Sequence, residues 1–172
     1  MLNFDLTQIK ALVFDVDGVL SASTIAMDDE GQPLRTLNVK DGYAIQLAVK
    51  RGLVVAIISG GHSPNIRKRY EYLGVKYIFM HSSYKIHDLE NLTRQTDIPL
   101  EQMLYMGDDI PDYEVMQSVG FPVCPADAAP EIKSISRYVS PFAGGQGAAR
   151  DVIEQVLKAQ GQWMSDKIAF GW

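Results

Sequence analysis

The sequence predicts an α/β fold in which helices cover a doubly wound parallel sheet. Short apolar runs alternate with longer segments whose apolar residues recur at helical spacing, and Gly and Pro stand between them. Runs this short fit strands that are buried on both faces of a sheet, and their alternation with helices indicates βαβ units. The length of 172 residues fits one main domain.

The first half of the chain holds three predicted strands, at residues 11–14, 53–58 and 75–80. Between the first two, the segment 21–39 has turn-forming residues at its centre, so we expect a β-hairpin flap that stands off the sheet. A helix follows Lys40-Asp41-Gly42 and is stopped by Gly52. The pair Ser63-Pro64 starts the next helix, which runs to Leu73 and is closed by Gly74.

The second half continues the alternation. A helix from Lys85 to about Gln95 leads to a strand at 103–106, and a helix that starts at Pro111 leads to a strand at 121–124. A glycine-rich loop, 144–147, precedes a last helix at 148–159. We therefore divide the chain into a domain, residues 1–160, which includes the flap, and a C-terminal tail, residues 161–172, which carries both tryptophans.

Composition argues against several classes of partner. The net charge of −5 disfavours nucleic acids and anionic membranes, and no apolar run reaches transmembrane length. Residues 1–10 lack the apolar core of a signal peptide. Cys124 is the only cysteine, which excludes an intrachain disulfide, and its place in an apolar run predicts a core residue. We expect a cytoplasmic protein.

Polar side chains end three of the predicted strands. Asp15 and Asp17 follow the first, Ser59 and Gly60 follow the second, and Asp108 and Asp109 follow the strand at 103–106, while Lys85 opens a helix. Each of these alone has an ordinary structural interpretation, as a turn residue or a surface lysine. Parallel sheets, however, bind ligands at the carboxyl ends of their strands, where these groups would meet.

The set Asp, Ser, Lys and Asp-Asp, in this order, resembles the four motifs of the haloacid dehalogenase-like hydrolases, from about Ala11 to Arg150. The resemblance implies a Rossmann-like sheet and a phosphatase that works through an aspartyl phosphate. Asp15 would be the nucleophile and Asp17 the general acid and base, while Ser59, the Gly60 N–H and Lys85 would bind the phosphoryl group.

The same resemblance implies a Mg²⁺ site. The carboxylates of Asp15 and Asp108, with the main-chain carbonyl of Asp17, would make the oxygen-only ligand set that Mg²⁺ prefers. Asp109 and Asp112 would support these ligands from behind. The three histidines are scattered along the chain, and His62 is expected in a solvated loop.

Many members of this superfamily carry a cap domain inserted after the first or the second motif. In this chain both segments are too short to hold one. Capless members with Asp41-Gly42, the Arg69 to Gly74 segment and the Gly144 to Arg150 segment resemble the 3-deoxy-D-manno-octulosonate 8-phosphate phosphatases. That family implies a homotetramer in which flaps and tails complete neighbouring sites, so we expect Trp163 to pack on another subunit and 168–172 to close an active site. The basic residues expected to bind the substrate carboxylate are Arg67, Lys68 and Arg69.

Three alternatives stay open at this stage. A phosphatase for a nine-carbon sialic acid or KDN 9-phosphate belongs to the same branch, but that branch tends to have Glu where Gly61 stands. A phospho-acceptor receiver domain uses similar residues, although it places its acceptor after the third strand and its further acids near the first. The glycine-rich loop at 144–147 would be either a phosphate-binding loop or an ordinary turn.

Overall fold

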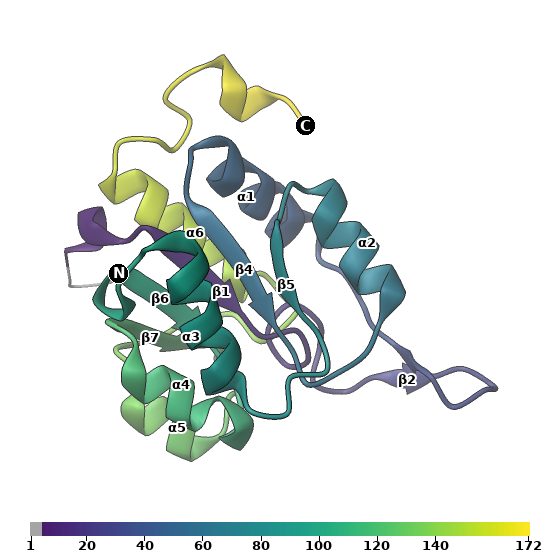
Figure 1. Cartoon of the computed structure of the whole chain (residues 1–172). Helices are drawn as coiled ribbons and strands as arrows, with labels where there is room; N and C mark the ends of the chain where they lie inside the picture. The colour runs from purple at the N-terminus through teal and green to yellow at the C-terminus, as the bar shows by residue number, and fades with distance from the viewer. Residues whose placement is uncertain (1–4) are drawn as a thin grey trace.

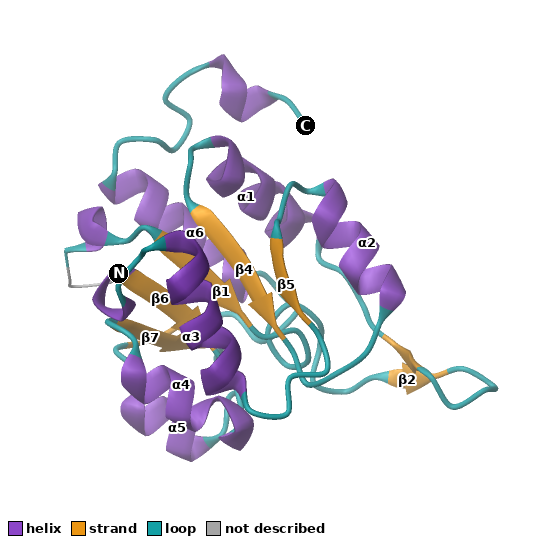
Figure 2. Ribbon diagram, viewed as in Figure 1, coloured by secondary structure: helices purple, strands orange, loops and turns teal. Residues whose placement is uncertain are grey.

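The computed structural model describes residues 5–172 and has the predicted α/β architecture. Six parallel strands form one sheet in the order β5-β4-β1-β6-β7-β8, with helices on both of its faces (Figures 1 and 2). The strands are β1 (Ala11–Phe14), β4 (Val54–Ile58), β5 (Tyr77–Phe79), β6 (Met103–Met106), β7 (Phe121–Cys124) and β8 (Tyr138–Val139).

The chain changes direction within the sheet between β1 and β6. It runs outward from β1 to β4 and β5, then returns to the other side of β1 and continues outward through β6, β7 and β8. The central strand β1 is therefore paired on both sides, with Phe14 opposite Ile57 of β4 and opposite Met106 of β6. In open parallel sheets, ligands bind at the carboxyl ends of the strands that flank such a reversal.

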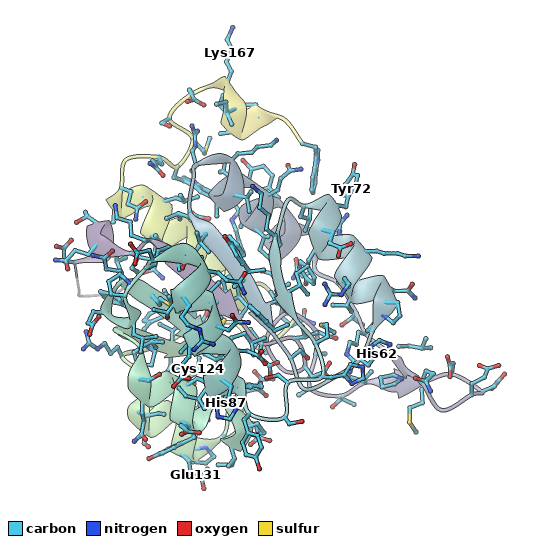
Figure 3. All side chains as sticks on the ribbon, in the orientation of Figure 1. His62, Tyr72, His87, Cys124, Glu131 and Lys167 are labelled. Carbon is cyan, nitrogen blue, oxygen red and sulfur yellow. The ribbon has the colours of Figure 1, made fainter. Side chains whose placement is uncertain are left out.

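The two helical layers divide the side chains of β1 between them. Leu12 and Phe14 belong to a core shared with α1 (Val39–Lys50), α2 (Pro64–Tyr72) and α6 (Ala148–Ala159). Ala11 and Val13 point to the opposite core, which α3 (Lys85–Thr96), α4 (Tyr113–Ser118) and α5 (Pro130–Ile135) complete. Burial on both faces explains why the strands are continuous apolar runs. Cys124, at the end of β7, is fully buried, as predicted (Figure 3).

Local capping chemistry fixes the helix starts. The Oγ of Ser63 accepts a hydrogen bond from the N–H of Ile66 at 3.3 Å, which confirms the predicted N-cap of α2. Asn38 caps α1 by accepting from the N–H of Lys40 at 2.9 Å, so this helix begins at Val39. The helix expected from Pro111 is split into a 3₁₀ turn, η3 (Ile110–Asp112), and α4.

The hairpin flap stands off the body of the molecule, as Figure 1 shows for β2. Its ladder is shorter than the pattern suggested, because only β2 (Ala26–Met27) and β3 (Pro33–Leu34) pair with one another. Neither strand is covered by a helix, and Met27 is 70% exposed. One α-helix and one strand of the sheet were not predicted: α5, which has six residues, and the edge strand β8, which has two.

The C-terminal tail folds back onto its own chain. The Trp163 ring meets the Tyr43 ring of α1 edge-on, with centroids 6.2 Å apart, and the Arg150 guanidinium lies 4.5 Å from the Trp163 ring centroid. Trp163 therefore packs against Tyr43 and Arg150 of its own chain, and its contact with a neighbouring subunit stays a prediction. After this anchor the chain forms η4 (Lys167–Phe170) and ends above α1 (Figure 1). Within residues 5–172, no helix combines the length and apolarity needed to cross a membrane.

Candidate active site

The ends of β1 and β6 bring the predicted acids together. The Asp15 N–H donates to the carbonyl of Met106 at 3.1 Å, so the loop after β1 starts beside the loop after β6. The Val16 carbonyl then accepts from the N–H groups of residues 19, 20 and 21, and this turn folds Asp17 back over the strand ends. Gly18 has φ +81°, and a Cβ there would lie 1.9 Å from a carboxylate oxygen of Asp108, so only glycine fits.

A buried lysine joins this loop to α3. The Nζ of Lys85 lies 3.0 Å from Asp15 and 2.7 Å from Asp112, and its side chain is 6% exposed. Burial lowers the pKa of Lys85, but the attraction of the two carboxylates outweighs it and raises the pKa overall. Lys85 is therefore a fixed cation behind the predicted nucleophile.

Asp112 connects the pieces of the site. One of its carboxylate oxygens accepts from Lys85 and from the Tyr105 hydroxyl, at 2.7 and 2.8 Å. The other accepts from the N–H of Asp108 at 3.0 Å. Asp112 is 1% exposed, so all of these partners are held without competition from water. Asp112 therefore links α3, β6 and the loop after β6 beneath the cavity.

Oxygens of Asp15, Asp108 and Asp112 lie within 4.8 Å of one another, a spacing that one metal ion can bridge. They line a cavity of about 270 Å³ together with Asp17. Burial raises the pKa of Asp108 to about 7, with repulsion from Asp15 next, and burial also raises the pKa of Asp15. Carboxylate oxygens such as those of Asp15 and the half-buried Asp108 fit a hard cation such as Mg²⁺, while Asp112 holds Lys85, Tyr105 and the Asp108 N–H.

Asp109 behaves differently from its neighbour. Asp109 is exposed, and it forms a capping box with Asp112 at the start of η3. It therefore stabilises the turn that carries Asp112 and stands outside the three-carboxylate group. Asp109 also lines the acidic cavity, beside Asp108.

The carboxylate of Asp17 is held by an arginine of the flap. Arg35 donates from Nε and Nη2 to the two oxygens of Asp17, at 2.7 and 2.8 Å. The residues are 18 positions apart in the sequence, and the flap folds over the loop after β1 to bring them together. Sequence analysis missed Arg35, because no local pattern marks the contact.

The loop after β4 lies at the same edge of the sheet. Ser59 is 1% exposed and accepts from the N–H of Gly61 at 3.2 Å, while Gly60 is exposed. His62 stacks on His81, with ring centroids 4.2 Å apart, and both are exposed, as predicted for a loop histidine. Figure 3 places His62 beside the base of the flap.

The three basic residues of α2 do not line this cavity. Arg67 donates to the carbonyl of Ile78 at 2.8 Å and pairs with Glu71. Arg69 lies against Gly42 of α1, and Lys68 is exposed. Within one chain, α2 therefore offers no cation to the Asp15 cleft, and the expected carboxylate site at this helix would have to face another subunit.

The glycine-rich loop packs against the site instead of binding phosphate through free N–H groups. The N–H of Gly144 donates to Asp127 and that of Gly145 to the carbonyl of Val19. A Cβ on Gly144 would lie 1.9 Å from the Gly18 carbonyl oxygen. The glycines therefore allow close contact with the loop after β1.

Comparison with known proteins agrees with this geometry. The sequence profile of the haloacid dehalogenase-like hydrolases matches residues 77–150. The 3-deoxy-D-manno-octulosonate 8-phosphate phosphatase of Escherichia coli K12 is 39% identical over 90% of this chain and 82% of its own. The chain belongs to this phosphatase family, within the haloacid dehalogenase-like hydrolases.

Solved structures of the phosphatase family show the same fold. The enzyme of Yersinia pestis superposes with a TM-score of 0.88 at 35% identity, covering 92% of this chain and 85% of that one. The enzyme of Moraxella catarrhalis, in complex with magnesium, phosphate and KDO, gives a TM-score of 0.90 at 32% identity, covering 97% and 96%. The predicted family, fold and capless architecture are confirmed.

Proposed function

We propose that this protein is a Mg²⁺-dependent phosphomonoesterase that hydrolyses 3-deoxy-D-manno-octulosonate 8-phosphate to KDO and phosphate. The observation that carries the proposal is the arrangement of Asp15, Lys85 and Asp108 at the point where the sheet reverses, in a chain of this phosphatase family. A magnesium ion held by Asp15, Asp108 and the Asp17 carbonyl would offset the charge of the phosphate dianion.

The residues of this chain divide the reaction into two displacements. A carboxylate oxygen of Asp15 attacks phosphorus, and the bond from phosphorus to the sugar oxygen breaks while Asp17 delivers a proton to that oxygen. Asp17 then takes a proton from water, which attacks the aspartyl phosphate and frees Asp15 and phosphate. Lys85 keeps Asp15 oriented, and Ser59 donates to a phosphoryl oxygen.

The octulosonate is preferred over a nine-carbon substrate because Gly61 offers no acid at the mouth of the site. The family relative that contains KDO, phosphate and magnesium supports the same choice. A receiver domain would retain its phosphoryl group, whereas this chain has the residues for its release.

We further propose a homotetramer in the cytoplasm. The flap exposes Met27, Leu34, Leu37 and Val39, and such grouped apolar side chains favour burial against another subunit. In that assembly Arg67, Lys68 and Arg69 would face a neighbouring cleft. The free, buried Cys124 means that the fold needs no oxidising compartment.

Phosphate release from a substrate panel tests the proposal. The panel contains the octulosonate 8-phosphate, a nine-carbon sugar acid 9-phosphate, a hexose 6-phosphate and an aryl phosphate. We expect the highest kcat/KM for the first, loss of turnover in EDTA and recovery with Mg²⁺. Asp15→Asn should lose at least about 100-fold in kcat while keeping the wild-type Tm. Equal kcat/KM for all four substrates, or a fully active Asp15→Asn variant, would contradict the proposal.

A further inference from the structure

Arg35 has one side of its guanidinium group in use and one side free. An arginine side chain carries five N–H donors, and the fork to Asp17 takes one from Nε and one from Nη2. The remaining edge carries Nη1. Among residues 5–172, Nη1 has no hydrogen-bond partner, although the atom is buried.

An unpartnered buried donor of a charged group is unusual. The Arg35 side chain is 6% exposed, so water does not replace the missing acceptor freely. Buried polar groups are nearly always hydrogen-bonded, and leaving a charged one unpaired is costly. The free edge of Arg35 is a planar fork that fits a carboxylate or a phosphoryl group in two-point contact.

The ion pair with Asp17 places the guanidinium group of Arg35 next to a residue of the acidic cavity. Its partner Asp17 lines the cavity that also holds Asp15 and Asp108. On the other side, a Cβ on Gly61 would lie 2.5 Å from Nη2 of Arg35 and 3.4 Å from Asp17. A side chain at residue 61 would therefore displace the guanidinium group from this place.

We propose that Arg35 is a substrate-binding residue whose free Nη1 edge binds an anionic oxygen of the sugar acid phosphate, while Nε and Nη2 position Asp17. The inference rests on the proposed phosphatase function and deepens it. It assigns to the flap, within the same chain, the cation that α2 does not supply. The anionic oxygen belongs either to the substrate carboxylate or to its phosphoryl group, and the experiment separates these two sources.

The principal variant is Arg35→Gln, which removes the charge. We expect KM for the octulosonate 8-phosphate to rise about 10- to 100-fold, because charge-assisted two-point contacts are among the strong hydrogen bonds. Inhibition by free KDO and by inorganic phosphate is measured in parallel against an aryl phosphate substrate. If Arg35→Gln raises the inhibition constant for KDO alone, the anionic oxygen belongs to the substrate carboxylate. If it raises the inhibition constant for phosphate alone, the oxygen belongs to the phosphoryl group.

A second variant, Gly61→Ala, keeps the charge but displaces the guanidinium group. Its effect on KM should have the same direction, and the double variant should be no worse than the poorer single one, because both changes remove one contact. Arg94→Gln, on the exposed face of α3, is the control and should match the wild type. Melting temperatures confirm that all four proteins fold.

The inference is overturned if Arg35→Gln lowers only kcat, with KM and both inhibition constants unchanged. Arg35 would then hold Asp17 and nothing else. The inference is also contradicted if the fold-increases in KM caused by Arg35→Gln and by Gly61→Ala multiply in the double variant. If the wild type does not hydrolyse the octulosonate 8-phosphate, the proposed substrate is wrong, but the inhibition constants measured with the aryl phosphate still decide the role of Arg35.

Discussion

At the scale of single residues, Asp112 orients other groups of the site through its hydrogen bonds. It binds Lys85 and Tyr105 through one oxygen and the N–H of Asp108 through the other. A Cβ on Gly107 would lie 2.4 Å from the Cβ of Asp112, so glycine is also needed for this close approach. One buried carboxylate therefore positions the β6 loop and Lys85, which in turn contacts the proposed nucleophile Asp15.

The first prediction concerns Asp112→Asn. An amide has one acceptor oxygen and an NH₂ group that would face either Lys85 or the Asp108 N–H, so one contact is lost. Loss of groups that orient metal ligands typically costs about 10- to 100-fold in metal affinity or activity. We expect the Mg²⁺ concentration for half-maximal activity to rise in that range. Asp97→Asn, at the exposed C-terminal end of α3, is the control, and an equal change in both variants would refute the assignment.

The candidate site residues that belong to sequence motifs were predicted. The residues that reach the site only through contacts made in the folded chain were missed. Asp15, Asp17, Lys85 and Asp108 stand at strand or helix ends, and the topology of a parallel sheet brings such positions together. Arg35 lies in a flap with no neighbouring signal. Tyr105 gave one weak signal, a hydroxyl within an otherwise apolar strand, because a buried tyrosine usually hydrogen-bonds.

At the scale of elements, helix α6 has its N-terminal cap supplied by another helix. Its own N-cap is Gly147, which has φ +107° and no side chain. The carboxylate of Asp41 in α1 accepts from the N–H of Arg150, in the first turn of α6, at 2.7 Å. Asp41 therefore replaces the missing cap and holds the two helices together.

The second prediction follows from the burial of Asp41. Burial raises the pKa of this carboxyl from 3.8 to about 6, although the Arg150 N–H and charge lower it in part. The folded state therefore binds more protons than the unfolded state between these pH values, and this group's contribution to stability falls as the pH rises through the window. The Tm of the wild type minus that of Asp41→Asn should decrease from pH 4 to pH 6 and then level off.

A pH series of thermal unfolding checks this result. The subtraction removes the contributions of other acids that are present in both proteins, including Asp15 and Asp108. A Tm difference that stays constant from pH 4 to pH 8 would show that Asp41 keeps its ordinary pKa.

Sequence patterns predicted the longer helices and strands but not the shortest ones. The strand at 103–106 and the helix at 148–159 were predicted at their observed bounds, because burial dictates their composition. The two-residue strand β8 and the six-residue helix α5 are too short for a periodic pattern. The flap ladder was overestimated, since Arg35 leaves it to bind Asp17.

At the scale of the whole molecule, the tail and the candidate site lie at opposite ends of the sheet. The tail reaches the C-terminal end of α1, where Arg51 pairs with Asp166 at 2.8 Å, and the strand β4 begins directly after this point. The acidic cavity lies at the other ends of the strands. Figure 3 shows the same separation between Lys167 and His62. The tail cannot cover the cleft of its own chain and would reach only that of a neighbour.

The last prediction is the effect of deleting residues 163–172. The deletion removes two edge-on aromatic contacts to Tyr43, the stacking of Arg150 on Trp163 and the pair with Arg51. The three ring contacts together are worth roughly 2–3 kcal/mol, which corresponds to a decrease of about 5–10 °C in Tm. Hydrolysis of an aryl phosphate at 25 °C should stay within about twofold of wild type, because the Asp15 cavity is remote.

Asp166→Asn breaks only the exposed pair and should lower Tm by much less. An unchanged Tm after the deletion would show that the tail is not docked on α1. A fall in kcat/KM for the sugar phosphate alone would show that the tail serves the site of a neighbouring subunit.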